Sequence, residues 1–161
     1  MARAFPHSQF VGYDYHADSV RTANERASAA GIRNARFEVA DAVGYDEEDL
    51  DLVTFFDCLH DMGDPIGAAR HAYQALKPDG HCLLVEPLAG DHVQDNLNPV
   101  GRVYYGAPSQ ICVAVSLARR GPALGAQAGQ ARLHQVMAEG GFRRFRRAAE
   151  TPFNLVLEAR P

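Results

Sequence analysis

The sequence predicts an α/β fold in which a doubly wound, largely parallel sheet ends in an antiparallel hairpin. The first observation is residues 50–87, where two short apolar runs, at 52–56 and 82–85, flank a helical pattern. Continuous apolar runs are typical of parallel strands that helices cover on both faces. The second observation is the end of the chain, where FRRFRR and FNLVLEA, joined through a Thr-Pro pair, have the pattern of a β-hairpin.

The helix between the two apolar runs has recognisable ends. We expect Asp64 to cap its N-terminus, with Pro65 at the first helical position, where the missing N–H costs nothing. Residues 77–80, Lys-Pro-Asp-Gly, are expected to end the helix as a tight turn. Ligands of such sheets bind beyond the carboxyl ends of the strands. In this chain those positions hold Asp57, Cys58, His60, Asp61 and Glu86.

The other elements follow from the same patterns. A strand at 9–13 ends in Asp14, a helix at 17–30 is closed by Gly31, and a strand at 35–39 leads to Asp41. Residues 88–126 have no strand pattern and include one predicted helix at 99–117, so this segment is interpreted as a lid or substrate-binding insertion. A further helix at 127–138 precedes the hairpin, and the whole of residues 1–161 is predicted to be a single domain.

Composition limits the class of protein. The chain has 161 residues, 47% of them hydrophobic and 22% charged, with a formal net charge of −4. This charge predicts neither nucleic acid nor a membrane surface as a partner. With no apolar leader and no run of about 18 apolar residues, we predict a cytoplasmic protein. The three cysteines, Cys58, Cys82 and Cys112, lie in or beside apolar segments, which predicts buried free thiols and no metal site.

Together, the order and spacing of these segments resemble those of class I S-adenosylmethionine-dependent methyltransferases. The matching segments are FVGYD, FEVAD, DLVTFFDCLHDMGDP, ALKPDG, LLVEP and the terminal hairpin, and the resemblance extends from residue 9 to the end of the chain. It is strongest to bacterial small-molecule enzymes that carry an N-terminal winged-helix segment. The resemblance implies a Rossmann-like fold, S-adenosylmethionine as cofactor and a small-molecule methyl acceptor as partner.

The resemblance also implies roles for individual residues. Asp14, beside Tyr15, would accept hydrogen bonds from the ribose hydroxyls; its alternative role is to cap the following helix. The adenine-binding candidates are Asp41 and Ala42, and the candidates near the methionyl part are Asp57 and Cys58. His60, in a segment similar to the LHDWSD segment of O-methyltransferases, is the candidate base, with packing at the strand end as the alternative. Candidate substrate-binding residues in the insertion are Asn96, Asn98, Tyr104 and Tyr105, whose alternative role is helix packing and capping.

The chain departs from the family pattern at its start. No first strand and no GxGxG turn precede the strand at 9–13, so we expect two strands with unpaired edges. This predicts either a missing N-terminal segment or self-association, and impaired activity. One alternative is a non-catalytic, incomplete core with weak or no cofactor binding. Another is an NAD-dependent oxidoreductase, because an acid after the second strand also suits the NAD ribose, although its GxGxxG turn is absent.

Overall fold

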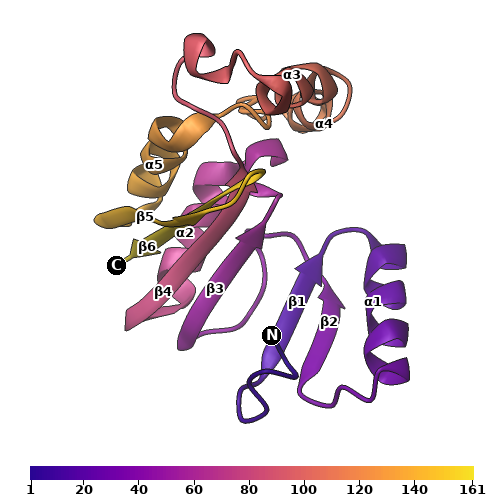
Figure 1. Ribbon diagram of the computed structural model, residues 1–161. Helices are drawn as coiled ribbons and strands as arrows, with labels where there is room; N and C mark the ends of the chain where they lie inside the picture. Colours follow the sequence, from indigo (N-terminus) through magenta and orange to yellow (C-terminus); the bar gives the residue numbers. More distant parts are fainter. The chain divides into compact units, whose positions relative to one another are not determined.

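The first 46 residues form a parallel strand pair with one helix (Figure 1). Strand β1 (Phe10–Asp14) pairs in parallel with β2 (Ala35–Val39), and α1 (Ala17–Ala29) connects them. The computed structural model describes residues 1–161; residues 1–46 form one of its two compact units and residues 47–161 the other. Gly31 ends the helix as predicted, because its φ of 66° lies in the left-handed region that glycine adopts freely.

The second unit is built on a four-stranded mixed sheet. Its strands lie in the order β3-β4-β6-β5, with β3 parallel to β4 and the other two pairs antiparallel. The terminal hairpin is therefore confirmed. The predicted single sheet is instead two sheets. Strand β1 pairs only with β2, and β3 pairs only with β4. Strands β1 and β3, the two expected to have an unpaired edge, therefore each have one neighbour. The bounds are β3 (Leu50–Phe56), β4 (Leu76–Pro87), β5 (Arg144–Glu150) and β6 (Asn154–Arg160).

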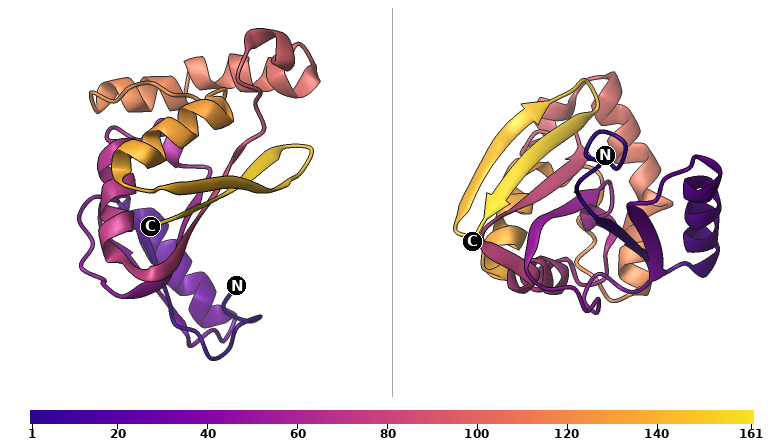
Figure 2. Two further views of the ribbon diagram at one scale, coloured as in Figure 1. Left: turned by 90° about the vertical axis from the view of Figure 1, so that its left-hand side faces the viewer. Right: turned by 90° about the horizontal axis from the view of Figure 1, so that it is seen from below.

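Two helices pack together on one face of this sheet (Figures 1 and 2). Helix α2 (Pro65–Ala75) begins as predicted, with Asp64 accepting the N–H of Gly67 at 2.7 Å. Helix α5 (Gly129–Gly140) meets it closely, because a Cβ on Gly140 would lie 2.5 Å from the Cβ of Ala69. The glycine thus allows the two helices to approach each other.

The core of the second unit lies between this face and the helices. Cys82 pairs with Ala159 and Leu84 with Leu157 across β4 and β6, and all four side chains are 0% exposed. On the opposite face the β3 residues Leu52 and Phe56 remain 41% and 54% exposed. Within residues 47–161 the helices therefore cover one face of the sheet rather than the two expected from the apolar runs.

Residues 77–80 do not form the predicted tight turn between helix and strand. They belong to β4, as an irregular stretch in which Leu50 pairs with Leu76 but Leu52 already pairs with His81. The extra residues bulge out of the ladder, and Gly80 permits this because a Cβ there would lie 3.0 Å from the carbonyl oxygen of Leu50. Because Leu76 follows the last residue of α2 and pairs with Leu50, strand pairing begins directly where the helix ends.

The predicted helix at 99–117 is broken in the structure. It consists of α3 (Pro99–Gly106), the 3-10 turn η3 (Ala107–Ser109) and α4 (Cys112–Ala118). Pro108 explains the break, because its nitrogen cannot donate a helical hydrogen bond and its ring collides with the preceding turn. Figures 1 and 2 show α3 and α4 beyond the carboxyl ends of β3 and β4. None of the helices is both long and apolar enough to cross a membrane.

Candidate functional site

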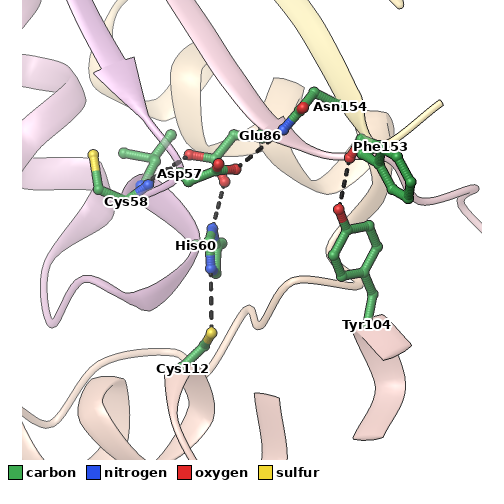
Figure 3. Close-up of polar contacts among 9 residues, drawn as sticks. Asp57, Cys58, His60, Glu86, Tyr104, Cys112, Phe153 and Asn154 are labelled. Atoms are coloured by element: carbon green, nitrogen blue, oxygen red, sulfur yellow. Dashed lines mark hydrogen bonds and ion pairs between the residues drawn. The ribbon is translucent and has the colours of Figure 1, made fainter. Parts of the chain in front are cut away.

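A buried histidine–glutamate pair lies at the carboxyl ends of β3 and β4 (Figure 3). After β3 the backbone of Asp57 adopts a φ of 48°, and the chain turns into the 3-10 helix η1 (Leu59–Asp61). This turn brings His60 to Glu86, near the end of β4, so that Nδ1 of the histidine lies 2.5 Å from Oε2 of the glutamate. The two side chains are 5% and 1% exposed, which makes this a fully buried polar pair.

Glu86 holds the turn as well as the ring. Its Oε1 accepts the backbone N–H of Leu59 at 2.9 Å and that of Cys58 at 3.3 Å. A carboxylate can only accept hydrogen bonds, so the proton of the pair is assigned to Nδ1 of His60. When the ring is neutral, its Nε2 is therefore the acceptor atom. That nitrogen lies 3.3 Å from Sγ of Cys112, the first residue of α4.

The surroundings shift the pKa of His60 upward. Burial alone would lower the pKa of the imidazole, but the hydrogen bond and the negative charge of Glu86, assisted by Asp61 and Asp57, raise it above the ordinary value of 6.5. The carboxyl of Asp61 also has a raised pKa, because burial outweighs the nearby charges of His60 and Arg119. His60 therefore becomes a neutral base at a higher pH than an exposed histidine does.

The cysteines near this pair are thiols at neutral pH. Burial, followed by the charge of Glu86, raises the pKa of Cys58 to about 12. Burial and the charge of Asp61 raise the pKa of Cys112. All three cysteines are free, as predicted, but only Cys82 is fully buried, while the other two are half-buried. In residues 1–161 no cluster of His, Cys, Asp and Glu side chains has the arrangement needed to hold a metal ion.

Residues of the insertion and of the hairpin turn meet at the same strand ends. The hydroxyl of Tyr104, on α3, donates to the carbonyl of Phe153 at 2.8 Å, and Nδ2 of Asn154 lies 3.4 Å from Oδ1 of Asp57 (Figure 3). The predicted cofactor residues Asp57 and Cys58 and the predicted substrate residue Tyr104 are thus brought near His60. The hairpin turn is an additional contributor to this group.

The other candidates in the insertion are engaged elsewhere or exposed. Asn96 is buried, and its amide bonds to both backbone groups of Gly90 and to the carbonyl of His92. Asn98 caps α3 by accepting the N–H of Gly101 at 2.9 Å. Tyr105 is 42% exposed. The capping alternative thus describes the observed contacts of Asn98, whereas Asn96 holds the loop at Gly90 and His92. A role of these residues in binding substrate stays a prediction.

The adenosyl candidates lie in residues 1–46, at the carboxyl ends of β1 and β2. Because these strands are parallel and Asp14 pairs with Val39, Asp41 follows at the same edge. Asp14 is exposed, and its Oδ1 accepts the N–H of His16 at 2.8 Å. The alternative role of Asp14 as the helix cap is wrong, because His16 occupies that position and its ring accepts the N–H of Ser19.

The two neighbouring candidates lie at the same edge of the strand pair. Tyr15 is 56% exposed, and Ala42 is half-buried directly after Asp41. The acidic side chains and these two neighbours are therefore gathered as expected of a site at the ends of parallel strands. Their contact with a cofactor stays a prediction.

Comparisons with known proteins identify the family. A family model described as a methyltransferase domain matches residues 1–141. The chain therefore belongs to the methyltransferase family, as a class I S-adenosylmethionine-dependent methyltransferase domain. It is 30% identical over 81 residues to the uncharacterised methyltransferase YcgJ of Bacillus subtilis (strain 168), an alignment that covers 49% of this chain and 32% of YcgJ.

Solved structures share the fold. A candidate O-methyltransferase from Nostoc punctiforme superposes with a TM-score of 0.75 at 18% identity, over 99% of this chain and 47% of that one. The mitomycin 7-O-methyltransferase MmcR gives a TM-score of 0.68 at 18% identity, over 99% and 44% of the two chains. PigF, solved with SAH, gives 0.71 at 14% identity, over 99% and 45%. The chain thus has a methyltransferase-like α/β fold and spans about half the length of these structures.

Two members of the site were not assigned a role from the sequence. In the sequence, Glu86 is an acid at the end of an apolar strand, where ligand-binding groups of such sheets lie. Its pairing with His60 is not evident from the sequence, because the two residues are 26 positions apart. Cys112 is 52 residues from His60 and lies in a segment without any motif. No local pattern in the sequence identifies it.

Proposed function

We propose that this domain transfers a methyl group to an oxygen atom of a small molecule, with His60 as the general base. The observation that carries the proposal is the buried pair of His60 and Glu86, in which a carboxylate fixes the ring so that Nε2 faces away from it. The similarity in fold to O-methyltransferases supports an oxygen acceptor and a small substrate. S-adenosylmethionine, the cofactor of this family, supplies an electrophilic methyl group on a sulfonium centre.

In this mechanism the protein's residues align the acceptor and remove its proton. The acceptor's O–H would donate to Nε2 of neutral His60, in the place that the Cys112 thiol otherwise holds. This nitrogen would take the proton as the oxygen gains the methyl group and the bond from that carbon to the sulfonium sulfur breaks. Glu86, which holds Nδ1–H, stabilises the imidazolium that forms. Because Glu86 also fixes the turn at Cys58 and Leu59, the position of the base depends on this one carboxylate.

The residues at the ends of β1 and β2 fit the adenosyl part of the cofactor. Asp14 is exposed and uses Oδ1 for the N–H of His16, so lone pairs of the carboxylate remain to accept ribose hydroxyls. Asp41 and Ala42 would take the adenine, with Tyr15 beside the ribose. Asp57 and Cys58 would line the methionyl side. Residues 1–9, which precede β1, form turns and contain no glycine, so they do not provide the GxGxG turn of the family pattern.

The insertion at 88–126 is proposed to cover the acceptor. The contact from Tyr104 to the carbonyl of Phe153 holds α3 to the hairpin turn, next to the strand ends that carry the base. Tyr104 and Tyr105 offer aromatic surfaces suited to a planar acceptor. Asn96 and Asn98 would shape this cover through the backbone contacts they make.

The experiment that tests this function measures transfer of labelled methyl from S-adenosylmethionine to a panel of small phenols and aliphatic alcohols. We expect transfer to at least one phenol and a loss of about 100-fold or more in His60→Gln, the amount a general base typically contributes. The control variant is His7→Gln, which changes an exposed histidine ahead of β1. Transfer that is equally fast in His60→Gln would remove His60 as the base, and no transfer to any oxygen acceptor would contradict the proposed reaction.

A further inference from the structure

A thiol faces the one ring nitrogen of His60 that Glu86 leaves available. Sγ of Cys112 lies 3.3 Å from Nε2, and Oε2 of Glu86 lies 2.5 Å from Nδ1 on the other side of the ring (Figure 3). The histidine is 5% exposed, whereas Cys112 is half-buried. A potential nucleophile, a base and a carboxylate that orients the base are therefore aligned, with the nucleophile nearest to solvent.

We propose that Cys112 is a modification site at which His60 and Glu86 activate the thiol for exchange with small uncharged or cationic disulfides. The proposal rests on the alignment of the three side chains and does not require methyl transfer. Both reactions use Nε2 of His60, so the thiol and a methyl acceptor compete for this nitrogen. The reaction needs only a low-molecular-weight disulfide as co-reactant.

The exchange balances without any further reagent. Nε2 of neutral His60 takes the proton from Sγ, and the sulfur attacks one sulfur atom of the disulfide. The S–S bond of the small molecule breaks, a new S–S bond forms to Cys112, and the departing thiolate takes the proton from Nε2. Cys112 is oxidised to a mixed disulfide, the small disulfide is reduced to one bound half and one free thiol, and His60 is neutral again.

The charges around the thiol select the kind of disulfide. Besides burial, the negative charges of three carboxylates raise the pKa of the Cys112 thiol: Asp61 from η1, Glu86 from β4 and Asp57 from the end of β3. A positive charge, that of Arg119, lies near Asp61 and partly offsets the rise in pKa that burial gives that carboxyl. Negative charge therefore dominates at the sulfur, which keeps it a thiol until a base removes the proton and disfavours an anionic reagent.

Cys58 provides an internal comparison. It is also half-buried and also near Glu86, but it is the backbone N–H of Cys58, not its thiol, that contacts the carboxylate. Burial raises the pKa of its thiol to about 12. Because His60 contacts the sulfur of Cys112 and not that of Cys58, Cys58 is expected to react much more slowly than Cys112.

The test uses the full chain and 4,4′-dithiodipyridine, an uncharged disulfide that releases a chromophore on exchange. Mass spectrometry of peptides identifies the modified cysteine. We expect modification at Cys112, with a rate that rises with pH as His60 becomes neutral. His60→Gln should slow the reaction by about tenfold or more, and His7→Gln, at an exposed histidine ahead of β1, should leave it unchanged. An anionic disulfide, 5,5′-dithiobis(2-nitrobenzoate), should react more slowly than the uncharged reagent.

Two results would overturn the proposal. One is preferential modification of Cys58, and the other is a rate at Cys112 that His60→Gln does not change. If the histidine variant does not fold, the pH dependence in the unmodified chain decides: a rise near the raised pKa of His60 supports the proposal, whereas a rise only near the pKa of the thiol contradicts it. Glu86→Gln gives a second check, because it should move this rise to lower pH.

Discussion

Oε2 of Glu86 lies 2.5 Å from Nδ1 of His60, while Oε1 of the same carboxylate accepts the N–H groups of Leu59 and Cys58. One side chain on β4 therefore orients the ring and also fixes the turn that carries it. This links the electrostatics of His60 to its position. The two contributions can be separated by substitutions that keep the shape of the side chain.

Glu86→Gln should move the activity of the domain to lower pH. The amide retains an oxygen for the backbone N–H groups, but it removes the negative charge that raises the pKa of His60. The neutral base then forms at lower pH, so the rise of kcat with pH should shift to lower pH and its maximum should fall. Glu48→Gln, at an exposed position of the same unit, is the control and should behave as the unmodified chain does. An unchanged pH profile in Glu86→Gln would show that the carboxylate does not set the pKa of the base.

The same pair predicts how stability depends on pH. The pKa of His60 is raised on folding above the ordinary value of 6.5, so the folded chain holds this proton more tightly than the unfolded chain. The stabilisation is fully present below 6.5 and is lost as pH rises through the folded pKa. The free energy of unfolding of the unmodified chain should therefore exceed that of the His60→Gln variant. The difference between them should be largest at about pH 6 and should shrink toward about pH 9. Urea denaturation across this range measures it, and a constant or growing difference would contradict the assignment.

The sequence predicts elements whose determinants are local, and it misses those set by tertiary contacts. Asp64 and Pro65 identify the start of α2 because a cap and a proline act on the adjacent turn. Residues 77–80 read as a turn, but pairing of Leu76 with Leu50 extends β4 through them. In the same way Glu86 ends a predicted strand, whereas its contact with His60 depends on how β3 and β4 are placed side by side.

The two faces of β4 should respond differently to the same truncation. Leu84 is 0% exposed between the sheet and the helices, whereas its neighbour Leu83 points to the other face and is half-buried. Leu84→Ala should lower the free energy of unfolding by about 2–5 kcal/mol, through lost apolar contact and a residual cavity. Leu83→Ala is the matched control and should cost about 1 kcal/mol, since less surface is taken out of water there. Equal losses for the two variants would mean that both faces of the sheet are equally covered.

Asp14 should contribute directly to binding the adenosyl group. S-adenosylhomocysteine is the probe, and isothermal titration calorimetry should show Asp14→Ala weakening its binding by about 1.5–3 kcal/mol, the value of hydrogen bonds to a charged acceptor. Because Oδ1 of Asp14 also accepts the N–H of His16, alanine could act by loosening the turn before α1. Asp14→Asn separates these effects, since its amide oxygen can still accept from His16 while the negative charge is lost. We expect this variant to melt at the temperature of the unmodified chain and still bind more weakly, whereas Glu25→Ala, at an exposed acid in the second half of α1, should bind normally. Binding by Asp14→Asn that equals the unmodified chain would remove Asp14 from the cofactor site.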